Sequence, residues 1–212
     1  AQFGSLLTSQ ISLFTGTQIR AIEVADLAGL LTDQIASFST VHIGSLTSSQ
    51  IQSLSTDQLR AIRTNTITSL NSVNIEVLNS QQLSSLTSDQ IAAFNTNQIK
   101  AIEKADFSKL QTQQLIALNA SQIFALTTDQ LTVMSSDQTR ALTSIQMAAL
   151  SSSQVSALTT DQVSKLTSLQ LPAIDAVDMR TFSPHVQSLW HLERGQDGIH
   201  QHLQASATSN TR

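Results

Sequence analysis

Apolar and polar residues recur along this chain with a period of eight. Every eighth residue from Phe14 to Phe182 is Leu, Ile, Phe or Met. The residue three positions before each member of this column is also apolar, with Thr139 as the one exception. The frame holds from residue 7 to residue 182, through 22 octads without an insertion or deletion. A period this regular predicts a repeat protein.

A glutamine column runs in the same frame, four residues before the first apolar column. Sixteen of its 22 positions are Gln, and the residue three before is Ser, Thr, Asn or Asp in 16 octads. Ser or Thr followed three residues later by Gln, as in Thr47 and Gln50, is a capping box that opens a helix. Each octad is therefore predicted to begin a helix that the next cap ends. The remaining six positions of the column are Asp26, His42, Thr66, Asn74, Asp106 and Asp178.

The predicted fold class is all-α, a solenoid of very short capped helices with one helix per octad. A continuous helix is a poor alternative, because eight residues at about 100° each overshoot two turns by about 80° and would spiral the apolar stripe around the helix. Such short helices persist only when stacked neighbours bury their apolar residues. The alternative is a β-solenoid, which the scarcity of Gly and the abundance of Ala, Leu and Gln disfavour.

Three segments are expected: an octapeptide-repeat solenoid over 1–182, a capping or docking helix over 183–197, and a mobile tail over 198–212. The Ser183-Pro184 pair suits the start of the second segment. The first octad is incomplete, which predicts either continuation of a longer array or an end that stacks on another subunit. The residues expected to dock the two ends are Phe3, Leu6, Leu189 and Trp190.

A longer period of five octads, or 40 residues, is marked by cations two positions after the glutamine column. In addition, residues 21–26 and 101–106 are nearly the same, at twice this period. The cations are either inherited from a duplicated ancestor or aligned as one stripe, if five octads complete a whole number of superhelical turns. A stripe would dock a neighbouring protomer or an anionic polymer such as a surface polysaccharide. Its members are Arg20, Arg60, Lys100, Arg140 and Arg180.

Composition argues against several classes of function. The net charge is −4 and only 12% of residues are charged, which disfavours nucleic acid as a partner. No segment has the roughly 18 consecutive apolar residues of a membrane span. There is no nucleophile elbow, phosphate-binding glycine loop or metal-ligand spacing, so we expect no enzyme activity, no cofactor and no metal. An exterior of Ser, Thr and Gln favours an extracellular or cell-surface location.

The segment Leu158-Thr159-Thr160-Asp161-Gln162-Val163 resembles the opening helix of transcription-activator-like effector repeats. The likeness covers about one octad per unit, and no DNA-reading residue of that family has a counterpart here. More broadly, the octads resemble the Leu-Thr-x-x-Gln-Ile-x-Ala-Leu arrays of secreted and surface proteins of proteobacteria. This resemblance implies a bacterial repeat protein and no defined activity.

Two functional hypotheses follow from these patterns. The first is a non-enzymatic structural protein that forms or joins a filament, surface layer or adhesin stalk through end-to-end or lateral self-association. The alternative is a binding module for a regular polymer, namely a glycan, ice or nucleic acid. Ser or Thr fills 17 of 22 positions two before the glutamine column, which would provide a hydroxyl ladder for such a polymer.

Overall fold

A computed structural model describes residues 3–174 of the chain, and within this range all regular structure is helical. It contains 20 α-helices of four to six residues and two 3-10 helices, and no strand is found between residues 3 and 174. The all-α solenoid with one short helix per octad is confirmed, and the β-solenoid alternative is wrong. The chain divides into two compact units, Ala1–Met134 and Ser135–Arg212. The helix expected over 183–197 and the tail over 198–212 lie outside the described residues.

The first unit begins with the 3-10 helix η1 (Phe3–Ser5) and contains sixteen α-helices. These are α1 (Thr8–Ile11), α2 (Gly16–Ala21), α3 (Val24–Ala28), α4 (Thr32–Ala36), α5 (Thr40–Ser45), α6 (Ser48–Ser53), α7 (Thr56–Ala61), α8 (Thr64–Ile67), α9 (Ser72–Glu76), α10 (Ser80–Ser85), α11 (Ser88–Ala93), α12 (Thr96–Ala101), α13 (Lys104–Phe107), α14 (Thr112–Ile116), α15 (Ala120–Ala125) and α16 (Thr128–Thr132). The second unit contains α17 (Ser136–Ala141), α18 (Ser144–Ala148), α19 (Ser152–Ser156), α20 (Thr160–Ser164) and the 3-10 helix η2 (Leu171–Ala173).

The predicted capping boxes start most of these helices. In α6, the backbone N–H of Gln50 donates to the Thr47 hydroxyl at 3.2 Å, and the Thr47 N–H donates to Gln50 Oε1 at 2.8 Å. The helix ends at Leu54, whose extended backbone (φ −66°, ψ 132°) turns the chain away before another helical turn forms. No described residue has a positive φ, so the bends between helices do not depend on glycine.

The two apolar columns form the core. Ile51 and Leu54 are 0% and 3% exposed, and the equivalent residues of the other described octads are also buried, except Phe14 in the first octad, which is half-buried. Each buried side chain of this size stabilises the fold by roughly 1.5–3 kcal/mol, largely offset by the entropy of ordering the chain. Thr139, the polar exception in its column, is also fully buried. Its hydroxyl donates to the Ser135 carbonyl at 3.1 Å, which satisfies its hydrogen-bonding group.

Helices pack against those three octads away along the chain. In the first unit α5 packs on α2, α6 on α3 and α7 on α4, and in the second unit α20 packs on α17. The side chain of Gln50, in α6, also reaches the Ile22 carbonyl at the end of α2, four octads earlier. One superhelical turn therefore takes between three and four octads in each unit, as the equivalent bond from Gln170 to Leu142 shows for the second.

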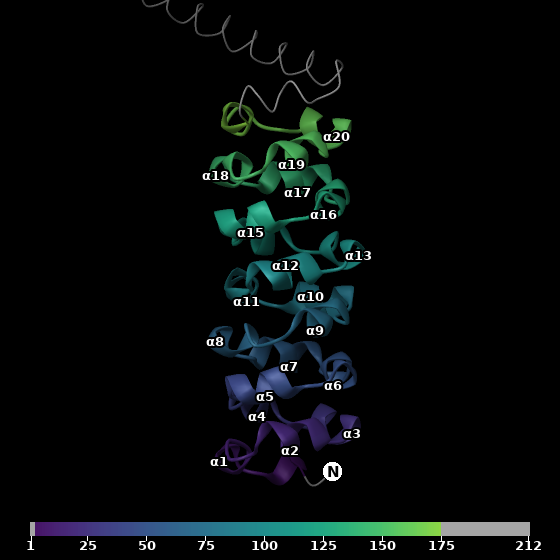
Figure 1. The fold of residues 1–212 in the computed structure, drawn as a ribbon, viewed down its shortest axis with the longest axis vertical. Helices are drawn as coiled ribbons and strands as arrows, with labels where there is room; N and C mark the ends of the chain where they lie inside the picture. Colours follow the sequence, from purple (N-terminus) through teal and green to yellow (C-terminus); the bar gives the residue numbers. More distant parts are fainter. Residues whose placement is uncertain (1–2, 175–212) are drawn as a thin grey trace, which may run out of the picture. The chain divides into compact units, whose positions relative to one another are not determined.

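This pitch contradicts the expectation that five octads complete a whole number of turns. With between three and four octads per turn, five octads make about one and a half turns. In the first unit, α1 and α11 lie on the left of the view, whereas α6 and α16 lie on the right (Figure 1). Helices five octads apart therefore lie on opposite sides of the first unit, and helices ten octads apart lie on the same side.

Candidate interaction surfaces

The glutamine column does more than cap its own helices. Gln82 is 4% exposed, and its Oε1 accepts from the Asn79 N–H at 3.2 Å. Its Nε2 donates to the carbonyls of Ile51 at 3.2 Å and Leu54 at 2.9 Å, at the end of α6. The Ile51 carbonyl also accepts from the Leu54 N–H at 3.2 Å, whereas the Leu54 carbonyl lies beyond the last turn, where no N–H of the helix can reach it. One carboxamide thus caps the start of α10 and the end of a helix in the preceding turn.

We call this arrangement the glutamine ladder. In each rung Nε2 donates to the carbonyl 28 residues earlier, and in each rung it also reaches the carbonyl 31 residues earlier. For example, Gln90 donates to Ile62 at 2.6 Å and to Leu59 at 2.9 Å. In the first unit the same pair of bonds is made by Gln34, Gln50, Gln58, Gln98, Gln114, Gln122 and Gln130, and in the second by Gln170.

His42 and Asn74 replace glutamine and keep its donor. His42 Nε2 lies 2.7 Å from the Phe14 carbonyl, and its Nδ1 lies 3.3 Å from the Ser39 backbone nitrogen. Because a carbonyl only accepts, Nε2 carries the proton and Nδ1 accepts, so the neutral ring reproduces both halves of a carboxamide. Asn74 Nδ2 donates to the Leu46 carbonyl at 3.0 Å, although its side chain is too short to cap its own helix as well.

At Thr66 a neighbouring residue supplies the missing donor. The Thr66 hydroxyl donates to the Arg63 carbonyl at 3.0 Å and does not extend to the preceding turn. Instead, Arg63 Nη2 donates at 2.9 Å to the carbonyl of Phe38, which is 28 residues before Thr66. Arg63 therefore makes the rung that a glutamine at position 66 would make.

The first turn exposes the donor side of the ladder. Gln10 and Gln18 are exposed, and their Oε1 atoms accept from the N–H groups of Leu7 and Thr15, both at 2.8 Å. The predicted docking residues Phe3 and Leu6 are half-buried, and the carbonyls of both accept from Gln34 in the next turn. Phe3 also packs edge-on against Phe14, with ring centroids 6.4 Å apart. Leu189 and Trp190, predicted for the other end, lie outside the described residues.

The predicted cationic stripe is not one stripe in the first unit. Arg20 on α2, Arg60 on α7 and Lys100 on α12 are all exposed. With between three and four octads per turn, successive members of this set are about one and a half turns apart and do not line up along one side. Arg140, on α17 in the second unit, is also exposed, and Arg180 lies outside the described residues.

The described cations form few ion pairs. Lys104 Nζ lies 4.0 Å from Asp129 Oδ2, with both side chains mostly exposed. An exposed pair of this kind contributes about 0–1 kcal/mol. Arg60 and Arg140 each follow an aspartate by three residues, but neither makes an ion pair with it in residues 3–174.

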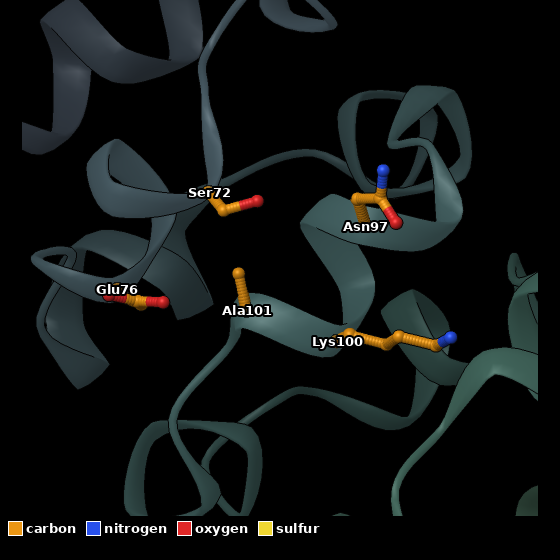
Figure 2. Close-up of a pocket in the computed structure, with 5 residues that line it drawn as sticks. All are labelled: Ser72, Glu76, Asn97, Lys100 and Ala101. Carbon is orange, nitrogen blue, oxygen red and sulfur yellow. The ribbon is translucent and has the colours of Figure 1, made fainter.

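A shallow polar hollow lies between α9 and α12 in the first unit. It has a volume of about 270 Å³ and is lined by Ser72 and Glu76 on one side and by Asn97, Lys100 and Ala101 on the other. Figure 2 shows the Ala101 methyl group between the two helices and the Lys100 side chain directed away from Glu76. Glu76, Asn97 and Lys100 are exposed and Ser72 is half-buried.

Residues 3–174 contain one histidine, His42. No group of three or more His, Cys, Asp or Glu side chains in this range is placed to hold a metal ion. No helix in the same range is long and apolar enough to cross a membrane. Four of the five histidines, at positions 185, 191, 200 and 202, lie outside it.

These features define a helical solenoid of octapeptide repeats in which a side-chain amide links successive turns. The model of the ALTTAQ repeat family matches residues 19–56, 99–136, 107–144 and 134–168, together just over half of the chain. The chain belongs to the ALTTAQ repeat family. The matches beginning at 99 and 107 overlap and differ by one octad, in agreement with the repeat frame. No curated protein matches the chain.

Replacing Gln82 by Glu tests the ladder. The substitution keeps the acceptor that caps α10, but it removes the donor and places a buried charge against two carbonyls. We expect the free energy of unfolding to fall by about 3 kcal/mol at neutral pH. The penalty should shrink in acid, where protonation restores a donor to the new side chain. Urea denaturation measures both effects against Gln81→Glu, which adds the same charge at an exposed neighbouring position. Equal stability of the two variants at neutral pH would contradict the ladder.

Arg63→Ala should lower the free energy of unfolding by about 1 kcal/mol, because the Phe38 carbonyl loses its donor. Adding Thr66→Gln should restore most of that loss, since the new carboxamide occupies a ladder position. Thermal or urea denaturation of the single and double variants measures the coupling. Arg60→Ala, at an exposed cation without such a bond, is the control and should change little. Failure of Thr66→Gln to rescue Arg63→Ala would show that Arg63 acts in another way.

Proposed function

We propose that this protein is a non-enzymatic structural solenoid that associates with copies of itself through the faces of its turns. The glutamine ladder supports this proposal because the two faces of each turn differ and are complementary. One face presents Nε2 donors, and the other presents the carbonyls that end its helices. An interface between two different faces can repeat into an open filament when the rotation between copies does not close a ring, whereas a two-fold dimer interface always closes. Association of this kind would build a filament or extend a stalk.

In this proposal the face of the first turn is one that another turn can dock against. Gln10 and Gln18 are exposed and have the same register position as the buried rungs that follow them. Their Nε2 groups could bond carbonyls at the end of another array, as Gln34 does with Phe3 and Leu6 inside this one. The same face would serve equally for preceding octads of a longer array. Self-association is thus a repetition of a contact that already holds the turns together.

The proposed location is the exterior of a bacterial cell. The exposed positions carry mainly Ser, Thr, Gln and Asn, and only 12% of the residues are charged. The octad consensus also resembles arrays of secreted and surface proteins. A filament, surface layer or adhesin stalk fits a repeat with this exterior. Binding of an anionic polymer along one cationic stripe is not part of the proposal, because successive cations of the first unit are about one and a half turns apart.

Light scattering and negative-stain electron microscopy of the full chain, over a range of concentrations, test self-association. We expect particles that lengthen with concentration. The double variant Gln10→Glu/Gln18→Glu should remain folded, because both side chains can still accept from their cap N–H groups, but it should associate at least about tenfold more weakly. The control Gln52→Glu/Gln81→Glu adds the same charge to exposed lateral positions.

The outcomes separate three cases. Loss of association in the Gln10/Gln18 variant alone supports docking through the turn faces. Loss in the lateral control alone would redirect the proposal to side-by-side packing. A well-behaved monomer of the unmodified chain at high concentration would overturn self-association.

A further inference from the structure

The hollow between α9 and α12 is lined by polar side chains that are not bonded to the rest of the described protein. In the ladder, each carboxamide is bonded on both its acceptor and its donor side. By contrast, the side chains of Ser72, Glu76, Asn97 and Lys100 make no hydrogen bond or ion pair with other described residues. These four side chains are a hydroxyl, a carboxylate, a carboxamide and an ammonium, so together they provide both donors and acceptors.

The floor and the sides of the hollow have different chemistry. The Ala101 methyl group lies between Ser72 and Asn97, while Glu76 approaches from the α9 side (Figure 2). Ala101 is the one apolar residue among the five that line the hollow, so polar contacts would dominate the binding of a ligand there. A sugar ring has the matching form, with C–H groups on its faces and hydroxyl groups around its edge.

An exposed aromatic ring lies on the next helix of the same stack. α15 packs against α12, as α9 does on the other side. Phe124 on α15 has the same register position as Glu76 on α9 and Lys100 on α12, two residues after the glutamine column, and is 65% exposed. Adjacent packed helices are about 8–10 Å apart, so Phe124 is one helix spacing from Lys100. A phenyl face of this kind can pack against the C–H face of a sugar.

We propose that this face of the first unit binds a glycan chain, with one sugar unit in the hollow and a neighbouring unit against Phe124. Glu76 accepts from sugar hydroxyls, and Asn97 both donates and accepts. Ser72 contributes a hydroxyl from the opposite side. Lys100 lies between the two subsites and donates to a ring substituent.

Nucleic acid fits this face poorly. The hollow carries one cation and one anion, whereas binding of a phosphate backbone depends on several cations. The proposed glycan site does not require the chain to self-associate, since the turn faces and this lateral face are formed by different side chains. Its test is therefore independent of the test of assembly.

Isothermal titration of the full chain with three soluble hexasaccharides tests the site. The probes are hexamers of glucose, N-acetylglucosamine and mannuronate. We expect binding of at least one hexamer, weakened about tenfold or more by Asn97→Ala, by Glu76→Ala and by Phe124→Ala. The matched controls are Gln81→Ala, at the register position of Asn97, and Ile116→Ala, at that of Phe124. Both should bind as the unmodified chain does.

Lys100→Gln tests whether the bound glycan is anionic or neutral. A loss confined to mannuronate indicates an anionic glycan, and a loss for the neutral hexamers indicates recognition of hydroxyl or amide substituents. Circular dichroism and thermal melting of each variant establish that the helices are retained. The proposal is overturned if no hexamer binds, or if the three site variants bind as tightly as their controls.

Discussion

The carboxamide of the ladder glutamines is the interaction on which this solenoid depends. A glutamate at the same position could accept from a cap N–H group and so open a helix equally well. It could not donate to the carbonyls that end a helix in the preceding turn. Gln82 performs both tasks with a single buried group, and it thereby links the start of one helix to the end of another 28 residues earlier. The advantage of a donor and an acceptor on one side chain explains why glutamine predominates over glutamate in the column, although Asp26, Asp106 and Asp178 carry only acceptors.

The ladder also explains how helices of four to six residues persist. Isolated helices of this length are unstable in water, because the cost of nucleation is spread over too few hydrogen bonds. Here the groups left unpaired at both helix ends are bonded by the caps and by the next turn, while Ile51, Leu54 and their equivalents bury the apolar columns. Stability is then a property of neighbouring turns, as in other solenoids. Damage to one rung, such as the loss of Arg63, should weaken the contact between two turns most strongly.

The local structure could be predicted from the sequence, but the relation between turns could not. Capping boxes and two apolar columns are local patterns, so the octad helices and their buried residues followed from the residues alone. The donor role of glutamine was missed, although a partial signal was present: no position in the column is Glu, and both His42 and Asn74 keep an N–H donor. The three Asp residues in the column weaken this signal, because an ionised carboxylate cannot donate. The role of Arg63 has no such signal, because Glu23 and Glu103 occupy the equivalent cap positions.

The number of octads per turn decides which repeats share a surface, and the octad frame carries no information about it. Because five octads reverse the side of the first unit, the 40-residue period of its cations does not build one continuous face. Ten octads restore the side, and this is the spacing at which residues 21–26 and 101–106 are nearly the same. The lateral positions are also free to vary, since the ladder and the core occupy other columns. A polar hollow and an exposed ring, such as those at Asn97 and Phe124, can therefore arise on one face without altering the contacts that hold the turns together.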